Sequence, residues 1–382
     1  MTTKQKTMPL LRFPEFAAEW QHGRVDSFLV LQRGFDLTKK TSSEGIYPVY
    51  SSSGISYYHD EFKVRGPGLV TGRKGSVGPV FIVEEDFWPH DTSLWVKDFK
   101  GNDVAYCYYF LTHFDLSRFD EASSVPTLNR NNVHRESAAF PTLPEQRKIA
   151  GFLTAVDGRI GQLSQKKALL EDYKRGVMQQ LFTQALRFKD EHGNDFPDWE
   201  EKTLGDIGSI VGGGTPDSTN DFYWKGDVQW FTPTEISSKY AIRSKRTIST
   251  AGLKNCSASI LPIGTLLLTS RATIAEVSIA TEECTTNQGF QSIIVSKGVS
   301  NEFIYYWVLQ NRNEFLRKAQ GSTFLEIGGK EMRKMPISIP SLPEQTKIAN
   351  FLSALDRKIE SVSSQIRETQ AFKKGLLQQM FV

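Results

Sequence analysis

The stretch LPEQRKIAGFL at Leu143–Leu153 recurs as LPEQTKIANFL at Leu342–Leu352. Both copies continue without a gap, to Phe182 and to Phe381, and 18 of their 40 residues are identical. Each copy opens with Pro followed by Glu. This pair favours the first turn of a helix, because Pro needs no NH donor there and Glu complements the helix dipole. We therefore predict that each of the two copies forms one long helix.

Both copies carry the heptad pattern of a coiled coil. Apolar residues recur at alternating steps of four and three, and eight of ten such positions are apolar in each copy. The polar exceptions are Lys167 and Lys174 in the first copy and Thr369 and Lys373 in the second. We expect a helix–helix and partner interface formed by Ile149, Leu153, Val156, Ile160 and Leu163 and by Ile348, Leu352, Leu355, Ile359 and Val362.

About 36 residues at about 1.5 Å each would make a rod on the order of 55 Å long. A rod with one apolar stripe needs a partner, and the available partner is its own copy. The alternative is that each helix packs only on its neighbouring globular segment. Five successive heptads argue against that alternative.

The duplication extends beyond the helices. FPEFAAEWQHGRVDSF from Phe13 stands before the first globular segment, and FPDWEEKTLGDIGSI from Phe196 stands before the second. GLVTGRKGSVGPVFIVEED from Gly68 parallels TLLLTSRATIAEVSIATEE from Thr265. Short strand patterns alternate with turns in both segments, which favours α+β domains with a curved antiparallel sheet. The resulting division is a globular segment at 1–142, a helix at 143–190, a second globular segment at 191–341 and a helix at 342–382.

Composition narrows the class of protein. The chain has 382 residues, 39% hydrophobic and 23% charged, which fits a globular protein of two or three domains. Its net charge of +3 gives no long-range basic field, so any nucleic-acid contact must be local. No stretch has the length of a signal peptide or membrane span. The cysteines Cys107, Cys256 and Cys284 lack metal or disulfide spacing, and we expect reduced thiols in a cytoplasmic protein.

TGRKGSVG at Thr71–Gly78 is the first candidate binding stretch. It lacks the GK[ST] of a phosphate-binding loop, and no helix pattern follows it. It is either a plain β-turn or a loop whose Arg73 and Lys74 contact DNA. The second half of the chain keeps Thr and Arg here but loses the glycines, which favours contact by Arg73 and Arg271. The candidate residues are Thr71, Gly72, Arg73, Lys74 and Ser76 and, in the second half, Thr269, Ser270, Arg271 and Thr273.

Two further stretches are candidates. SSKYAIRSKRTIS at Ser237–Ser249 offers Lys239, Arg243, Lys245 and Arg246, either as a solvated face or as a basic loop beside a strand end. TLNRNNVHR offers Asn129 and Arg130, which could read base edges or belong to a polar loop that caps the next helix. No HExxH or GxSxG pattern occurs, so we expect neither a catalytic metal nor a serine hydrolase. The chain resembles a binder more than a catalyst.

The combination of motifs resembles a known family. The twin LPEQ.KIA.FL helices, FPDWEEKTLGDI at Phe196, VGGGTP at Val211 and VPTLNR at Val125 are similar to the specificity subunit of type I restriction–modification systems. The resemblance covers essentially the whole chain. It implies that the two globular segments are target recognition domains, each reading one half of a bipartite DNA site, and that the two helices pair antiparallel as a spacer.

The resemblance also implies the partners. Two DNA methyltransferase subunits dock on the helices, and restriction subunits join the same assembly on double-stranded DNA. The reaction implied is N6-adenine methylation together with ATP-dependent cleavage of unmodified DNA. S-adenosylmethionine, ATP and Mg²⁺ are expected on the partner subunits, with no cofactor on this chain. The family's DNA-facing loops carry over to Thr71–Ser76 and Thr269–Thr273, and more loosely to Asn129–Arg130 and Lys239–Arg246.

Two other functions remain as alternatives. A stand-alone DNA-binding or DNA-cleaving protein would act on DNA without partners. A tandem adhesion or carbohydrate-binding protein on a coiled-coil stalk would not bind duplex DNA. The absence of an [ND]PP[YF] methyltransferase tetrapeptide and of a helicase phosphate-binding loop favours a non-catalytic subunit.

Overall fold

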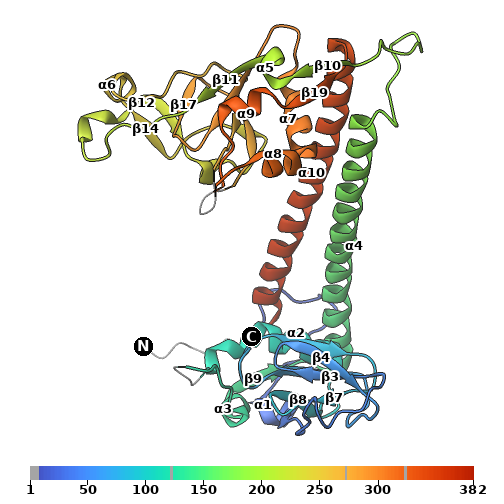
Figure 1. Cartoon of the computed structure of the whole chain (residues 1–382). Helices are drawn as coiled ribbons and strands as arrows, with labels where there is room; N and C mark the ends of the chain where they lie inside the picture. Colours follow the sequence, from blue (N-terminus) through green and yellow to red (C-terminus); the bar gives the residue numbers. More distant parts are fainter. Residues whose placement is uncertain (1–7, 121–123, 272, 322–324) are drawn as a thin grey trace. The chain divides into compact units, whose positions relative to one another are not determined.

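The computed structural model describes residues 8–120, 124–271, 273–321 and 325–382. Two compact units share these residues. Unit 1 comprises residues 1–166 and 362–382, and unit 2 comprises residues 167–361. Each unit therefore contains a globular part, one half of α4 (Leu143–Phe182) and one half of α10 (Leu342–Met380), the two long helices drawn in Figure 1.

Unit 1 contains a four-stranded and a three-stranded sheet. The larger sheet has the order β2-β8-β5-β6, and the smaller has the order β4-β3-β7. A separate antiparallel pair, β1 with β9, stands at the base of the long helices. The strands are β1 (Gln21–Arg24), β2 (Val30–Arg33), β3 (Tyr47–Ser51), β4 (Gly54–His59), β5 (Gly68–Gly72), β6 (Val80–Val83), β7 (Trp88–Pro89), β8 (Ser93–Asp98) and β9 (Ser137–Phe140), and the helices are α1 (Val25–Phe28), α2 (Val104–Phe114), a 3₁₀ turn (Leu116–Phe119) and α3 (Arg130–Arg135).

Unit 2 repeats this plan with an added strand. Its larger sheet has the order β11-β18-β15-β16-β13, its smaller sheet β14-β12-β17, and its separate pair is β10 with β19. The strands are β10 (Glu200–Thr203), β11 (Gly208–Gly212), β12 (Trp224–Phe231), β13 (Tyr240–Ala241), β14 (Arg246–Ile248), β15 (Leu266–Leu268), β16 (Val277–Ala280), β17 (Cys284–Thr286), β18 (Gln291–Val295) and β19 (Pro336–Ile339). The helices are α5 (Leu204–Ile207), α6 (Thr250–Lys254), α7 (Asn301–Gln310), α8 (Arg312–Lys318) and α9 (Gly329–Arg333), with 3₁₀ turns at Asp221–Tyr223 and Pro233–Glu235.

The shared strand order confirms the internal duplication. β2, β8, β5 and β6 of unit 1 correspond in order to β11, β18, β15 and β16 of unit 2. The single curved antiparallel sheet expected for each segment is wrong, because each unit has two main sheets, and the pairs β3–β7, β12–β17 and β13–β16 are parallel. Parallel neighbours need long crossovers, and the irregular loops between these short strands supply them.

The helical region at 301–319 is interrupted once. The stretch 301–319 resembles one helix in its apolar spacing, yet α7 ends at Gln310 and α8 begins at Arg312. Asn311 lies between them, and both its backbone NH and its side-chain amide donate to the carbonyl oxygen of Trp307, at 3.0 and 2.9 Å. A side chain that also bonds a backbone carbonyl in this way destabilises and often bends a helix, which favours a break at this residue.

The repeated LPEQ motif is explained by the same contacts in both units. In unit 1, Gln146 accepts from the backbone NH of Asp103, the N-cap of α2, at 2.9 Å, and donates to the carbonyl oxygen of Pro141 at 2.9 Å. Glu145 is 1% exposed and forms an ion pair with Arg12 at 2.7 Å. Gln345 and Glu344 in unit 2 make the equivalent bonds, to Ser300, Pro340 and Arg187. The motif thus fixes the start of each long helix to its globular part.

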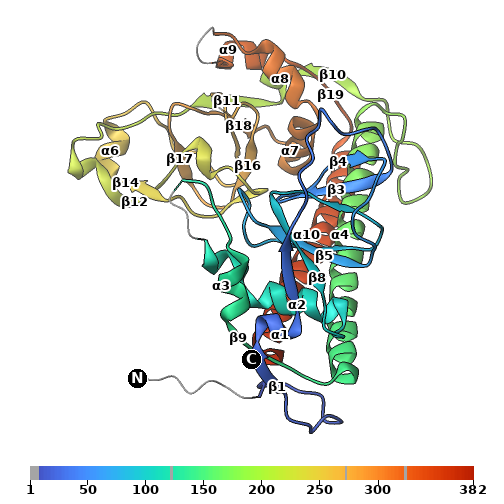
Figure 2. The same ribbon diagram turned by 90° about the horizontal axis from the view of Figure 1, so that it is seen from below.

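Within each unit the two long helices pack in opposite directions. In unit 1 the start of α4 and the end of α10 share one core, which contains Ile149, Leu153, Leu376 and Met380. In unit 2 the end of α4 and the start of α10 do the same, with Val177, Leu181, Ile348 and Leu352. Figure 2 shows α2 beside this pair in unit 1, and its aromatic side chains belong to the same core. The long helices therefore form the antiparallel coiled coil that the resemblance implies.

One backbone contact is also duplicated, although its covalent setting differs. The NH of Leu11 donates to the carbonyl oxygen of Gln379 on α10 at 2.9 Å. The NH of Leu186 donates to Gln180 on α4 at 3.1 Å. In unit 2 the chain runs directly from α4 into the segment that makes this contact. In unit 1 the two partners come from distant parts of the chain.

Among the described residues, no helix combines the length and apolar character needed to cross a bilayer. The same residues contain no group of His, Cys, Asp and Glu side chains placed to bind a metal ion. The cysteines are free thiols, and burial raises the pKa of Cys284 to about 12. At neutral pH this thiol stays protonated, so it is a poor nucleophile or metal ligand.

Candidate nucleic-acid interface

The turn after β5 is the centre of the candidate site in unit 1. Gly72 leaves no room for a side chain, because an added Cβ would lie 1.6 Å from the carbonyl oxygen of Ser76. The backbone NH groups of Arg73 and Lys74 donate to the carbonyl oxygen of Thr92, at 2.8 and 3.0 Å. Glycine thus permits the tight turn, and the residue before β8 holds the basic pair in place.

A second segment brings Asn129 and Arg130 to the same surface. The NH of Leu128 donates to the carbonyl oxygen of Arg73 at 2.8 Å. A hollow of about 380 Å³ opens at this junction, lined by Arg33, Arg73, Leu94, Thr127, Leu128, Asn129, Arg130 and Asn131. Two stretches that the sequence suggested separately therefore form one basic and amide-rich surface. Arg and Asn are the side chains that best match guanine and adenine edges in the major groove.

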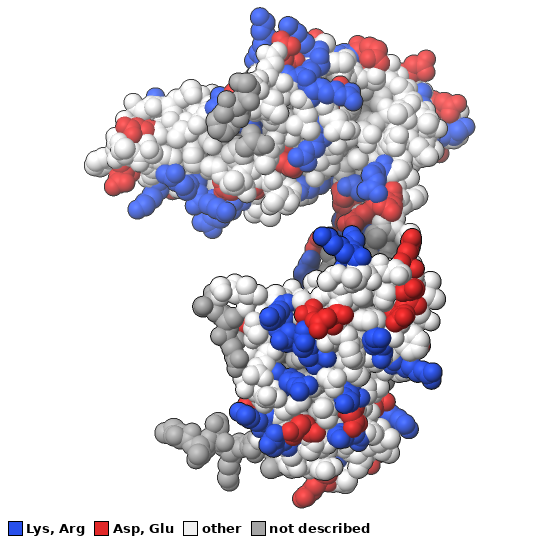
Figure 3. Space-filling view, turned by 60° about the horizontal axis from the view of Figure 1, so that its bottom comes forward, with Lys and Arg blue, Asp and Glu red and all other residues white. Residues whose placement is uncertain are grey.

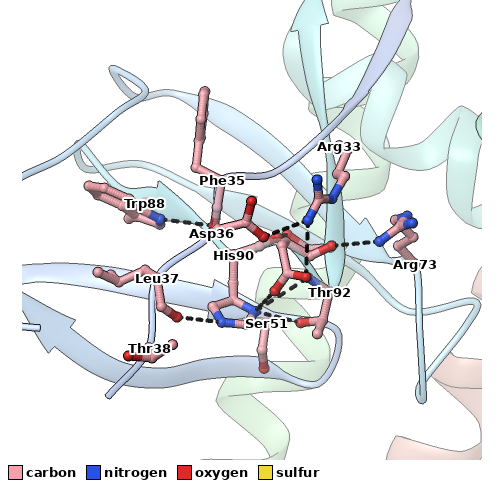
Figure 4. Close-up of polar contacts among 12 residues, drawn as sticks. Arg33, Phe35, Asp36, Leu37, Thr38, Ser51, Arg73, Trp88, His90 and Thr92 are labelled. Atoms are coloured by element: carbon pink, nitrogen blue, oxygen red, sulfur yellow. Dashed lines mark hydrogen bonds and ion pairs between the residues drawn. The ribbon is translucent and has the colours of Figure 1, made fainter. Parts of the chain in front are cut away.

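Figure 4 shows how this surface is supported from behind. The Nη2 of Arg33 lies 2.5 Å from Asp36 and 3.2 Å from Asp91, and the Nη1 of Arg73 donates to the carbonyl oxygen of Asp91 at 3.0 Å. His90 contacts the carbonyl oxygen of Leu37 at 2.8 Å. Each guanidinium keeps donors beyond those contacts, because Arg carries five NH groups. The network therefore orients both arginines without using up their capacity to bind.

Two predicted residues of this turn have structural roles. Thr71 is 1% exposed, and its hydroxyl donates to the carbonyl oxygen of Pro79 at 2.8 Å. Gly72 is buried as well. Their prediction as DNA contacts is corrected here, because a buried hydroxyl that already donates inside the fold has no route to DNA. Lys74 and Ser76 are exposed.

The polar stretch around Asn129 forms a short helix of its own. Asn129 is the N-cap of α3 and accepts from the NH of Asn131 at 3.0 Å. The alternative of a polar stretch that caps the helix after it therefore holds for α3, which Asn129 caps. Asn129 and Arg130 both remain exposed. Their exposed polar atoms stay compatible with base or phosphate contacts.

The equivalent turn in unit 2 carries Arg271. Its Nε lies 2.9 Å from the carboxylate of Glu326, and the two side chains are 46% and 35% exposed. The NH of Ile327 donates to the carbonyl oxygen of Ser270 at 3.1 Å, similar to the link between Leu128 and Arg73 in unit 1 but with the acceptor one residue before the arginine. The framework is the same in both units. In unit 2 the carboxylate of Glu326 pairs with the arginine of the turn itself, whereas in unit 1 the carboxylate of Asp91 pairs with Arg33.

Thr269 and Ser270 are both 0% exposed, so their prediction as DNA contacts is also corrected. The hydroxyl of Thr269 donates to the carbonyl oxygen of Thr273 and accepts from the NH of Glu276 at 3.0 Å. It closes the turn in the way Thr71 does in unit 1. Thr273 is exposed. Ala272, within the predicted range, lies outside the described residues.

The basic stretch of unit 2 runs from β13 in the larger sheet to β14 in the smaller sheet. Arg243, Lys245 and Arg246 are exposed, and the Arg246 guanidinium stacks 3.5 Å from the ring centroid of Trp224. A hollow of about 400 Å³ lies beside it, lined by Ser218, Asp221, Trp224, Lys225, Lys245, Arg246 and Thr247. Figure 3 shows Lys and Arg side chains gathered along the lower edge of unit 2, toward the end that carries α6, β12 and β14. This is a local basic patch on a nearly neutral chain.

Lys239 does not belong to that patch, and its prediction as a DNA contact is corrected. Its side chain is 13% exposed and forms an ion pair with Glu302 of α7. It also donates to the hydroxyls of Ser353 at 2.6 Å and Tyr306 at 3.2 Å. Lys239 therefore ties the start of the basic loop to α7 and α10 in the interior of unit 2.

This network predicts a pH-dependent stability. Burial opposes ionisation of Glu302, but hydrogen bonds from Lys239, Tyr240 and Ser353 outweigh it and lower the pKa of the carboxyl group. A folded-state pKa below the unfolded one stabilises the protein at neutral pH, and this contribution is lost as pH falls through the folded pKa. Glu302→Gln is expected to cost about 1 to 3 kcal/mol at pH 7.

Urea unfolding at several pH values measures this difference. The difference in unfolding free energy between parent and variant is expected to shrink once the pH falls below the ordinary pKa of Glu, about 4.3. It should vanish as the pH falls through the lower folded-state pKa of Glu302. Glu314→Gln on α8 is a control, because its ion pair with Arg317 is surface-exposed. A gap that persists unchanged in acid would show that Glu302 does not stabilise unit 2 through its charge.

Sequence reasoning missed several residues that line the hollows. Arg33 ends β2 and faces the same hollow as Arg73, and Ser218, Lys225 and Thr247 line the hollow beside Arg246. Arg33 could have been found, because it precedes a Gly at the end of an apolar strand, a pattern similar to that of the other turns. Lys225 gives no such signal, since its position depends on a positive φ of 61° in a non-glycine residue.

The family model described as type I restriction modification DNA specificity domain matches the chain twice, at residues 18–172 and 197–369. These matches cover most of both units. The chain belongs to this family. The two copies of the specificity domain correspond to the two halves of the internal repeat.

Several curated relatives are specificity subunits. The MjaIX specificity subunit of Methanocaldococcus jannaschii is 38% identical over 207 residues, which are 53% of this chain and 48% of the relative. The chain therefore matches about half the length of that relative. The putative MjaX specificity subunit of the same organism is 25% identical over 319 residues, 79% of this chain and 73% of the relative.

Solved structures share the fold over nearly the whole chain. The S subunit of a type I restriction–modification system from M. genitalium superposes with a TM-score of 0.63 at 16% identity, covering 98% of this chain and 99% of that one. A chain from a study of complex assembly and conformational transition of the type I system gives 0.60 at 16% identity, covering 94% and 96%. At this identity the likeness concerns the fold.

Proposed function

We propose that this chain is the DNA specificity subunit of a type I restriction–modification complex, with each unit reading one half of a bipartite duplex site. The observation that carries the proposal is the pairing of one framework with two unlike surfaces. Unit 1 presents Arg33, Arg73, Asn129 and Arg130, and unit 2 presents Arg246 on Trp224 and Arg271 beside Glu326. Two different half-sites require such a difference on a shared scaffold.

The proposal assigns no catalytic step to this chain. Methylation of adenine N6 and ATP-dependent cleavage would take place on partner subunits, which would bind S-adenosylmethionine, ATP and Mg²⁺. The role of this chain would be to contact phosphates and base edges and to hold the partners in place. The low net charge fits this division, because partner subunits can share the phosphate contacts.

Sequencing of methylated adenines in cells that carry the chain and its methyltransferase tests this function. A second strain would carry residues 191–341 from a relative with a different unit 2. One half of the recovered site is expected to change, while the other half stays the same. Loss of all sequence preference, or a change in both halves, would contradict the assignment of one half-site to each unit. DNA methylation or cleavage by this chain alone would favour the stand-alone alternative.

Equivalent exposed aromatic residues on the two long helices favour the binding of two copies of one partner protein. Tyr173 on α4 is 53% exposed, and Phe372, its repeat equivalent on α10, is 55% exposed. Large exposed aromatics are frequent anchors in protein interfaces. Their equivalence suggests that each anchors one methyltransferase subunit, and that restriction subunits join the assembly through the methyltransferases or beside them.

Tyr173→Ala and Phe372→Ala are each expected to weaken binding of one methyltransferase copy by about fivefold or more, since anchor truncation typically costs more than 1 kcal/mol. Together they should shift the assembly below two methyltransferases per chain, as measured by analytical ultracentrifugation. Tyr58→Ala is the matched control, because Tyr58 on β4 is 52% exposed. Equal binding by the double variant and the control would remove the aromatics from the interface.

A further inference from the structure

Three seam positions of the long helices carry lysine where the heptad pattern calls for an apolar residue, and two of these lysines, Lys174 and Lys373, pair with the other long helix. Lys174 on α4 lies 2.5 Å from the carboxylate of Asp356 on α10, within unit 2. Lys373 on α10 lies 2.6 Å from the carboxylate of Asp157 on α4, within unit 1. Both lysine side chains are 18% exposed. Asp356 and Asp157 are 31% and 34% exposed, so both ion pairs are partly shielded from solvent.

Each pair includes a tyrosine from the globular part of its unit. Tyr109 on α2 donates to Asp157 at 2.8 Å, and Lys373 lies 5.3 Å from the centroid of its ring. Tyr306 on α7 donates to Asp356 at 2.5 Å, and Lys174 lies 5.3 Å from the centroid of its ring. We call these two groups the Tyr–Asp–Lys triads. Each joins three helices at one point.

The triads are related by the internal repeat with the roles of the helices exchanged. Asp157 and Lys174 are 17 residues apart on α4, and Asp356 and Lys373 are 17 apart on α10. One antiparallel register therefore satisfies both pairs, and a displaced register satisfies neither. A shift of one heptad would place Asp157 opposite Ile366 or Met380 and leave its charge unpaired. The Asp157 side chain is 34% exposed, so a partly buried charge would lose its partner, which is unfavourable.

The apolar seam does not select a register by itself. Because Ile, Leu and Val recur every three or four residues on both helices, a shift of seven residues again brings apolar side chains together. Single polar residues in a seam select register and orientation in other coiled coils. We propose that the two Tyr–Asp–Lys triads are positioning residues that fix the antiparallel register of α4 and α10 and bind each globular part to that register.

Disulfide trapping in the full-length chain tests the register directly. In a background with Cys107→Ala, Cys256→Ala and Cys284→Ala, the pair Ile160→Cys with Thr369→Cys reports the native register. The pair Ile160→Cys with Leu376→Cys reports a shift of one heptad. The parent is expected to cross-link mainly through the first pair. Asp157→Lys is expected to reduce that cross-link at least fivefold and to increase the second.

The charge exchange Asp157→Lys with Lys373→Asp separates positioning from general damage. It restores opposite charges, so the native cross-link is expected to recover while the single reversal lacks it. The proposal is overturned if the single reversal cross-links in the native register as well as the parent does. It is equally overturned if the exchanged protein folds, as judged by circular dichroism, but does not regain that cross-link.

A second experiment, which measures methylation, rests on the proposed function. In the complex with methyltransferase, single reversals in either triad are expected to lower methylation at the native half-site spacing at least tenfold, and the exchange should restore it. Cross-links that respond while methylation does not would support the register role and count against the proposed function. Unresponsive cross-links would count against the triads alone, whatever the methylation result.

Discussion

Leu352→Asp is expected to unfold unit 2 and to prevent binding of the methyltransferase. Leu352 is 0% exposed in the core where the start of α10 meets the end of α4. Loss of a buried leucine costs about 2 to 5 kcal/mol through lost contacts and the cavity left behind. A carboxylate without a partner there adds a further desolvation cost. The sum approaches the whole stability of a typical domain, about 5 to 15 kcal/mol.

Urea unfolding followed by tryptophan fluorescence measures this effect, and co-purification measures assembly. Adding Ile359→Asp, a second seam position, should deepen both losses. Leu169→Asp is the control, because Leu169 lies on α4 but is 62% exposed, so its unfolding midpoint should hardly change. A normal midpoint together with full methyltransferase binding in Leu352→Asp would show that the seam is wrongly assigned.

Arg271→Glu is expected to have the largest effect on DNA binding. Glu326 orients the Arg271 guanidinium, and the reversal would set two carboxylates side by side on the proposed DNA face. A base-specific Arg contact is worth about 1 to 3 kcal/mol, or roughly 5- to 150-fold in affinity, and repulsion of phosphates would add to that loss. Arg73→Glu should produce the same class of loss through the other half-site.

Fluorescence anisotropy with a cognate duplex, titrated at several salt concentrations, measures both variants. Each should also lose base preference in one half-site while keeping it in the other. Arg175→Glu serves as the control, since Arg175 is a 72% exposed residue on α4. Both arginine side chains reach the surface, so folding should be preserved. Affinity equal to that of the control would remove the tested arginine from the DNA interface.

The long helices and the duplication could be predicted because they depend on periodicity. A heptad stripe and a repeated LPEQ can be read in one dimension, and both reappear as α4 and α10 with equivalent anchors. The function of Gln146 could not be read, because its partner Asp103 belongs to a segment 43 residues away. The register of the two long helices could not be predicted either, because the sequence does not show that Lys174 pairs with Asp356.

The stretches predicted to contact DNA remain candidates, and the structure buries part of each of them. Strand-end turns with Gly and Arg are visible in the sequence, and they mark Arg73 and Arg271. Burial is not visible there, so Thr71, Thr269 and Lys239 were indistinguishable from their exposed neighbours. Thr71 and Thr269 face inward to close the turns, and Lys239 faces α10. Sequence composition suggests which residues are polar, whereas the fold decides which of them meet solvent.

The duplicated contacts of Leu11 with Gln379 and of Leu186 with Gln180 have a consequence for chain connectivity. In unit 2 a short stretch of chain connects Gln180 to Leu186. In unit 1 Leu11 and Gln379 are far apart in the sequence and meet only through packing. A circularly permuted gene, opened between residues 183 and 199 and closed by a short linker across the Leu11–Gln379 contact, should therefore encode the same native contacts. The order in which a ribosome makes the two halves would then be immaterial to the folded molecule.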